Sequence, residues 1–166
     1  MSPIKSFAVL AMAGCALLAQ TALARQTFIH AGALIDRPGK PARGPSTIVV
    51  EGDRIVAVRD GLAAPDAPDT AVIDLTGQTV LPGLIDSHVH LDSDAGGIAA
   101  QLEGVTLSAG ALALNAYANG MKTLRAGFTT VRNLGDGSGA TLALRDAVNA
   151  GKVQGPRIMD AGNSIS

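Results

Sequence analysis

The feature that most constrains the fold is a short apolar run, residues 81–91, that ends in two histidines. Pro82-Gly83 predicts a turn at its start, and the residues after that turn predict an extended strand. Side chains of a strand alternate between its two faces, so His88 and His90 share one face with Asp86. Two imidazoles so placed can bind one divalent metal ion, with nitrogens about 2.0–2.1 Å from zinc. The triplet alone also fits a pair of solvated histidines.

The hydrophobic period of the chain changes at Gly83. Before it, β-branched and apolar runs are separated by Gly, Pro and Asp, a pattern typical of short strands. The Gly52-Asp53 pair between two such runs predicts a hairpin turn. The predicted strands are residues 27–35, 47–51, 55–59, 72–75 and 78–81.

After Gly83 the pattern predicts strands that alternate with helices. We predict strands at 84–90, 128–134 and 157–160, helices at 108–126 and 139–150, and a loop over 91–107. Apolar residues three and four apart predict the core-facing stripe of the first helix: Leu114, Tyr117, Met121 and Leu124. The order strand-helix-strand-helix-strand predicts an α/β fold with parallel strands and right-handed crossovers.

Four runs resemble, in order and spacing, segments of the amidohydrolase superfamily: residues 81–91, 126–135, 144–152 and 155–158. They are most similar to the branch of Xaa-Pro dipeptidases and imidazolonepropionase-like enzymes. The resemblance covers residues 27–166 and implies a TIM-like (β/α)8 barrel, whose first two to three units are residues 83–166. It also implies that residues 25–82 are half of a small β-sandwich. Because such a barrel takes about 250 residues, we expect an N-terminal fragment of a longer enzyme.

The resemblance also implies the chemistry. His88 and His90 would bind one or two divalent metal ions, zinc by expectation, and metal-activated water would cleave a C–N bond. The substrate would be a small molecule, either a dipeptide ending in proline or a cyclic amide. The remaining ligands and a proton-shuttling aspartate belong to later strands of the family fold. We therefore expect no catalytic residue within these 166 residues, and no turnover by the chain alone.

Three further residues are candidates for the surroundings of the metal. Asp86 is predicted to hydrogen-bond to an imidazole and fix its tautomer. The alternative for Asp86 is a carboxylate paired with an arginine near the barrel floor. Arg132 and Asn133 end the second strand on opposite faces, and one of them is predicted to lie at the rim of the site. Many relatives carry Asp at the position of Asn133, which weakens a role for charge there. His30 is predicted to lie outside the site.

The N-terminus is predicted to be a secretory signal peptide, residues 1–24. It has a basic start, an apolar run over 7–19 and small residues before a cut after Ala24. Export to the periplasm is the expectation. The apolar run is shorter than the about 20 residues of a membrane span, so no stable span is expected after cleavage. A membrane anchor and lipid attachment at Cys15 are the alternatives. Cys15 is the only cysteine, so the mature chain would carry no disulfide.

Composition excludes some partners. With 13 basic and 14 acidic residues and 2% aromatics, the chain shows neither a basic stripe nor stacking platforms, so nucleic acid is not expected. An oligomer is compatible with it. Two other classes of function remain: a non-catalytic exported fragment with a partial metal site, and a dinucleotide-binding loop. Residues Gly135 to Ala140 match the dinucleotide-binding motif G-x-G-x-x-G/A, and Asp160 follows at the distance expected of the acid that binds the ribose. Polar residues in the preceding strand argue against it.

Overall fold

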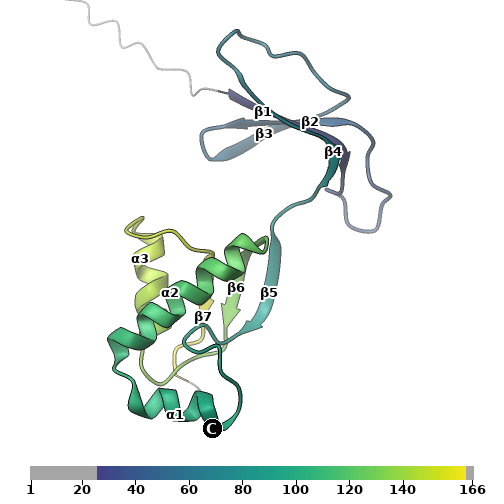
Figure 1. The fold of residues 1–166 in the computed structure, drawn as a ribbon. Coiled ribbons are helices and arrows are strands. Elements are labelled where there is room, and N and C mark those ends of the chain that lie inside the picture. The colour runs from purple at the N-terminus through teal and green to yellow at the C-terminus, as the bar shows by residue number, and fades with distance from the viewer. Residues whose placement is uncertain (1–25, 164–166) are drawn as a thin grey trace, which may run out of the picture. The chain divides into compact units, whose positions relative to one another are not determined.

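The computed structural model describes residues 26–163, which divide into two compact units, 26–80 and 81–163. Figure 1 shows the elements of each unit. The predicted signal peptide and Cys15 lie outside the described residues. None of the helices within residues 26–163 combines the length and apolar character needed to cross a bilayer.

The first unit is a four-stranded sheet in the order β3-β2-β1-β4. β2 pairs antiparallel with both β1 and β3, and β1 pairs parallel with β4. Gly52 has a positive φ of 59° in the β2–β3 turn, as the hairpin prediction requires. The strands are β1 (Gln26–Leu34), β2 (Ser46–Glu51), β3 (Arg54–Asp60) and β4 (Ala71–Val80).

The prediction of two strands over 72–81 is wrong, because β4 is continuous. Its register against β1 shifts between Ala31 and Ala33, so the ladder passes the Thr76-Gly77 pair without ending. Gly32 lies at this irregularity, and a Cβ built on it would be 2.0 Å from the carbonyl oxygen of Thr76. The two backbones approach so closely here that only glycine fits.

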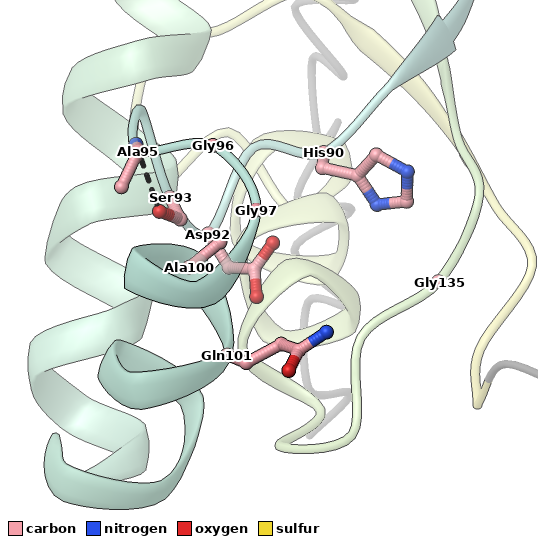
Figure 2. A pocket seen from close by; sticks show the side chains of 9 residues that line it. All are labelled: His90, Asp92, Ser93, Ala95, Gly96, Gly97, Ala100, Gln101 and Gly135. Carbon is pink, nitrogen blue, oxygen red and sulfur yellow. Dashed lines mark hydrogen bonds between the residues drawn. The ribbon is translucent and has the colours of Figure 1, made fainter.

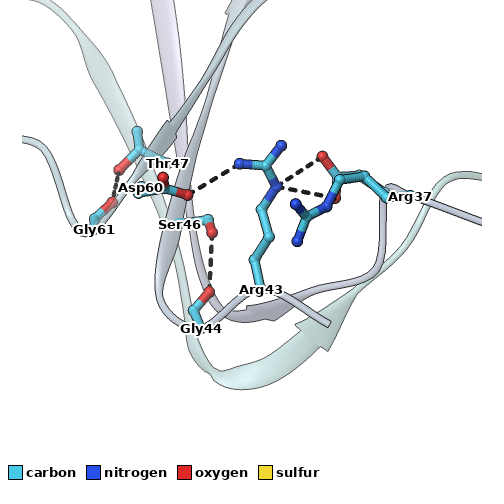
Figure 3. A network of polar contacts seen from close by, with 8 residues as sticks. Arg37, Arg43, Gly44, Ser46, Thr47, Asp60 and Gly61 are labelled. Atoms are coloured by element: carbon cyan, nitrogen blue, oxygen red, sulfur yellow. Dashed lines mark hydrogen bonds and ion pairs between the residues drawn. The ribbon is translucent and has the colours of Figure 1, made fainter. Parts of the chain in front are cut away.

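Arg43 lies in the loop between β1 and β2 and links this loop to the end of β3 (Figure 3). Nε of Arg43 donates to both carboxylate oxygens of Asp36, at 3.1 and 3.0 Å, and Nη1 donates to Asp60 at 3.0 Å. The hydrogen bond from Arg43 lowers the pKa of Asp36. These contacts connect the loop between β1 and β2 to the last residue of β3.

The second unit contains a parallel sheet in the order β5-β6-β7, joined by helices. Its elements are β5 (Leu84–Val89), α1 (Ile98–Thr106), α2 (Ala109–Arg125), β6 (Phe128–Asn133), α3 (Ala140–Asn149) and β7 (Arg157–Asp160). The predicted mixed α/β order with parallel strands is confirmed. The Ser108 side chain caps α2 by accepting a hydrogen bond from the Ala111 backbone N–H, at 3.2 Å.

The prediction of a loop over 91–107 misses α1. This helix buries none of its residues, and neither a capping side chain nor an acidic first turn marks its start. Gly97 precedes it and Gly104 lies inside it, and both residues favour a loop in a sequence pattern. Ile98 and Val105 are more than 80% exposed, so no core-facing stripe exists for periodicity to detect.

Helices α2 and α3 cover one face of the parallel sheet (Figure 1). The buried cluster joins both helices to all three strands or the residues that follow them: Leu91, Ala116, Val131, Leu144 and Ile158. The stripe predicted for α2 is incorrect, since Leu114 is 70% exposed. The buried residues of α2 are Leu112, Ala116 and Gly120.

Two of the three buried residues of α2, Ala116 and Gly120, are small, and α3 and the segment before β7 pack against the helix there. A Cβ at Gly120 would lie 3.5 Å from Pro156 and 3.7 Å from Leu144. The predicted stripe has larger side chains, but two of them, Leu114 and Tyr117, are exposed to solvent and do not face the core. Tertiary packing here overrides the apolar periodicity of the sequence.

We predict that Gly32→Ala lowers the free energy of unfolding by about 1–3 kcal/mol, because the new methyl group would overlap a backbone carbonyl that cannot rotate away. Gly77→Ala is the matched control on the partner strand: no atom lies within 4 Å of the position that a Cβ would take there, and its φ is not positive. Urea unfolding followed by circular dichroism measures both. Equal stability of the two variants would contradict the close approach.

Candidate metal site at the end of the parallel sheet

The two histidines of the predicted pair lie side by side. His88 lies in β5 and His90 directly follows it, with both side chains exposed. Their ring centroids are 5.6 Å apart, and the ring planes meet at 68°. A nitrogen bound at about 2.1 Å puts its ring centroid about 3.2 Å from an ion, so two such rings around one zinc lie about 5–5.6 Å apart. The spacing of the two rings therefore matches that of two ligands of one ion.

Two ligands are fewer than a catalytic zinc site requires, which is usually three from the protein. Within residues 26–163, no group of three His, Cys, Asp or Glu side chains is arranged to hold a metal ion. His30 lies in the first unit, where its Nε2 is 3.0 Å from the carbonyl oxygen of Ala63. Lys122, on α2, forms an exposed ion pair with Asp94 at 2.9 Å.

Asp86 contacts the peptide of a candidate ligand. Its Oδ1 accepts a hydrogen bond from the backbone N–H of His88, at 3.0 Å. The interaction seen is therefore with the backbone at His88, and not the predicted bond to an imidazole. It fixes the chain at His88 and leaves both rings exposed.

The two residues that end β6 have opposite environments. Arg132 is exposed, while Asn133 is completely buried. Oδ1 of Asn133 accepts from the backbone N–H of Leu91 at 3.1 Å. Its Nδ2 donates to Oγ1 of Thr141 at 3.0 Å and to Oδ2 of Asp160 at 3.2 Å. Of the two rim candidates, Asn133 is thus fully engaged within the protein, and only Arg132 has a solvent-accessible side chain.

Both backbone polar groups of Leu91, the residue that follows His90, are hydrogen-bonded to side-chain amides. Leu91 is 2% exposed, and its N–H is bound by Asn133. Its carbonyl oxygen accepts from Nδ2 of Asn119, on α2, at 3.0 Å. The buried amide of Asn133 and the half-buried amide of Asn119 therefore determine where the backbone leaves β5. They determine the position of His90 in the same way.

The loop just before α3 contains a carboxylate, Asp136, that sequence reasoning missed. Asp136 accepts hydrogen bonds from the backbone N–H groups and hydroxyls that follow it, those of Ser138, Gly139, Ala140 and Thr141. Burial acts to raise the pKa of Asp136, but the hydrogen bonds from Thr141 and Ser138 outweigh it and lower the pKa to about 2. The helix N-terminus is thus neutralised from within the chain.

This carboxylate disfavours the dinucleotide-binding alternative. A pyrophosphate would need the N–H groups at the start of α3, and Asp136 already occupies them. The acid expected to bind ribose, Asp160, accepts hydrogen bonds from Asn133 and from the N–H of Gly162. The letters of the motif are present, but its donors are used inside the fold.

A cavity of about 390 Å³ lies beside His90 (Figure 2). Besides His90, its lining includes the side chains of Asp92 and Gln101, and glycines at positions 96, 97 and 135 leave it open. Burial raises the pKa of Asp92, and the negative charge of Asp136 adds to this. Asp92 also escaped sequence reasoning, although its position two residues after His90 continues the spacing of the histidine pair.

Comparison with known proteins gives one family and several relatives. The sequence profile of the Amidohydrolase family matches residues 79–166. N-acyl-D-aspartate deacylase of Alcaligenes xylosoxydans xylosoxydans is 50% identical over 70 residues, which are 42% of this chain and 13% of the deacylase. Imidazolonepropionase of Fusobacterium nucleatum is 52% identical over 46 residues, 26% of this chain and 11% of that enzyme.

Among solved structures, a Xaa-Pro dipeptidase with bound methionine in its active site superposes with a TM-score of 0.74 and 35% identity. The likeness covers 85% of this chain and 34% of the dipeptidase. The chain thus spans about a third of the length of the solved relative and a smaller share of the other two.

We predict that Asp136→Asn lowers the free energy of unfolding at pH 7 by about 2 kcal/mol, because the charged acceptor of the α3 N-terminus is lost. The folded pKa of about 2 lies below the unfolded value of 3.8, so the stabilisation is full above pH 4. It is lost as the pH falls from about 4 toward 2.

The stability gap between wild type and Asp136→Asn should therefore close over that pH range, in denaturation followed by circular dichroism. Asp146→Asn is the control, since Asp146 is an exposed carboxylate on the same helix that pairs with Arg145. A gap that persists unchanged at pH 2 would show that the charge of Asp136 does not stabilise the helix.

Proposed function

We propose, from the premise that this chain belongs to the amidohydrolase family, that the whole protein is a metal-dependent hydrolase of C–N bonds in small molecules. The observation that carries the proposal is the pair of exposed imidazoles, 5.6 Å apart, at the carboxyl end of the first parallel strand. Exposed imidazoles at that end of the sheet are available for binding, because loops at the carboxyl ends of parallel strands form the active sites of barrels.

We further propose a dipeptide ending in proline as the substrate. The support is the structural likeness to the Xaa-Pro dipeptidase, which extends over 85% of the chain. A cyclic amide is the second candidate, favoured by the 52% identity to imidazolonepropionase across 46 residues.

His88 and His90 would hold the metal ion, zinc by our proposal, and further ligands would come from residues beyond those described. The ion would supply a water of lowered pKa and polarise the carbonyl that is attacked. The chain itself positions the two rings: Asp86 binds the peptide of His88, and Asn133 binds the peptide after His90. Such support of the ligands is how metal sites keep their geometry.

Around this site we propose the organisation that the sequence suggested. Residues 1–24 would be a signal peptide for export to the periplasm, 25–82 half of a β-sandwich, and 83–166 the first part of a barrel. Apolar side chains exposed on the strands of the parallel sheet support the last point. Ile85 is 70% and Met159 58% exposed, as expected if further strands cover them.

The test is hydrolysis by the whole protein, expressed from its gene, of a panel of Xaa-Pro dipeptides, N-acyl amino acids and cyclic amides. We expect Xaa-Pro cleavage that is lost on treatment with a chelator and restored by zinc, manganese or cobalt. Activity that survives complete removal of divalent metal would overturn the metal-dependent mechanism. Cleavage of cyclic amides alone would select the second candidate.

We predict that His88→Ala and His90→Ala each lower kcat/KM by at least about 100-fold and reduce the bound metal, because each removes one nitrogen ligand. His30→Ala is the matched control: it removes the remaining histidine, which lies in the first unit and is 3.0 Å from the carbonyl of Ala63. Metal content by mass spectrometry and kinetics are measured on the same preparations. Full metal content in both ligand variants would exclude the pair as the site.

A further inference from the structure

The cavity beside His90 contains a carboxylate that the proposed metal site does not use. Asp92, Gln101 and His90 all line this space of about 390 Å³. In Figure 2 the Asp92 carboxylate is directed into the region between the His90 ring and the Gln101 amide. A cavity of this volume is at the lower end of small-molecule sites and accommodates a group of amino-acid size.

Over residues 26–163, Asp92 has no ion pair or side-chain hydrogen bond of the kind formed by the acidic residues near it, Asp94 and Glu103. Asp94, two residues on, forms an ion pair with Lys122 at 2.9 Å. Glu103, on α1, accepts a hydrogen bond from the Ser93 hydroxyl. In the part of the chain that the structure describes, no lysine or arginine forms an ion pair with Asp92.

The charges around Asp92 favour a cation. The charged groups that act on it are Asp136 and Glu103, which are acidic, and His90. Asp136 is itself surrounded by hydrogen-bond donors, but none of them is a lysine or arginine. A half-buried carboxylate in such surroundings is stabilised by a positive group that enters the cavity.

We propose that Asp92 binds the α-ammonium group of the substrate, and that the cavity is the subsite for its N-terminal residue. The inference rests on the proposed function. In a dipeptide, the α-nitrogen lies about 2.5 Å from the carbon of the scissile carbonyl. A carbonyl bound at the histidine pair therefore brings its ammonium group next to those ligands, where His90 and Asp92 line one cavity.

The consequence is selectivity for a free amino terminus. A primary ammonium group forms a charge-assisted hydrogen bond to the carboxylate. An analogue without the amine leaves Asp92 desolvated and unpaired, and an N-acylated substrate replaces the cation with a neutral amide. The amide side chain of Gln101 offers a further polar group to the same residue of the substrate.

The test compares L-alanyl-L-proline with propionyl-L-proline, which lacks only the amine, in the metal-loaded whole protein. We expect wild type to prefer the dipeptide by about 10- to 100-fold in kcat/KM. In Asp92→Asn this preference should fall to within about threefold, because the loss falls on the dipeptide alone. Asp92→Glu, which keeps the charge, should retain part of it. Asp94→Asn is the matched control and should keep the full preference.

A binding measurement separates this inference from the proposed function. L-alaninamide, a cation, should bind wild type at least about tenfold more tightly than propionamide, and Asp92→Asn should abolish the difference. If no amide on the panel is cleaved but this difference is found, the subsite holds and the hydrolase proposal fails. If dipeptides are cleaved but Asp92→Asn keeps the full preference for the amine, the subsite is overturned. Loss of bound metal in Asp92→Asn would also overturn it, since the carboxylate would then hold the ion.

Discussion

A single buried amide determines how the carboxyl end of the parallel sheet is built. Asn133 uses its oxygen to hold the backbone after β5, and its nitrogen to bind Asp160 at the end of β7 and Thr141 in α3. The N–H of Leu91 fixes which end of the amide is the oxygen, and both nitrogen protons then have acceptors. Because a buried polar group without a partner costs about 1–3 kcal/mol, these contacts hold the three strand ends together as a set. Parallel strands place their functional loops at this end, so the position of His90 depends on that set.

The structure separates polar groups that build the site from groups that are available to a ligand. Asn133 and Asp136 are buried and fully engaged with neighbours in the chain. His88 and His90 are exposed, with the peptides around them held in place and their rings side by side. The hydrogen-bond partners of a residue near a candidate site thus indicate its role, whereas its residue type alone does not. Asn133 was a rim candidate by position, and its partners show that it supports the backbone.

Sequence reasoning found what depends on local periodicity. The parallel β-α-β-α-β order and the adjacent histidines follow from alternation along β5 and from the stop signals around α2 and α3. It missed α1, whose exposed apolar residues give no stripe, and it chose the wrong face of α2, which is buried through Leu112, Ala116 and Gly120. It also treated Asp136 as a variable letter of a glycine-rich motif. All three features depend on which residues are in contact in the folded protein, and the periodicity of a single sequence does not contain that information.

Three carboxylates in the loops of this unit show how partners decide function. Asp136 accepts hydrogen bonds from the start of α3, and its negative charge stabilises that helix. Asp94 pairs with Lys122 at the surface, an interaction that solvent weakens. Asp92 is only two residues from Asp94 in the sequence, yet it lines the cavity beside His90 and has no basic partner among the described residues. The same functional group thus accepts hydrogen bonds at the start of a helix, forms a surface ion pair and, by our proposal, binds a cation, and of the three only Asp92 lines the cavity where a substrate would enter.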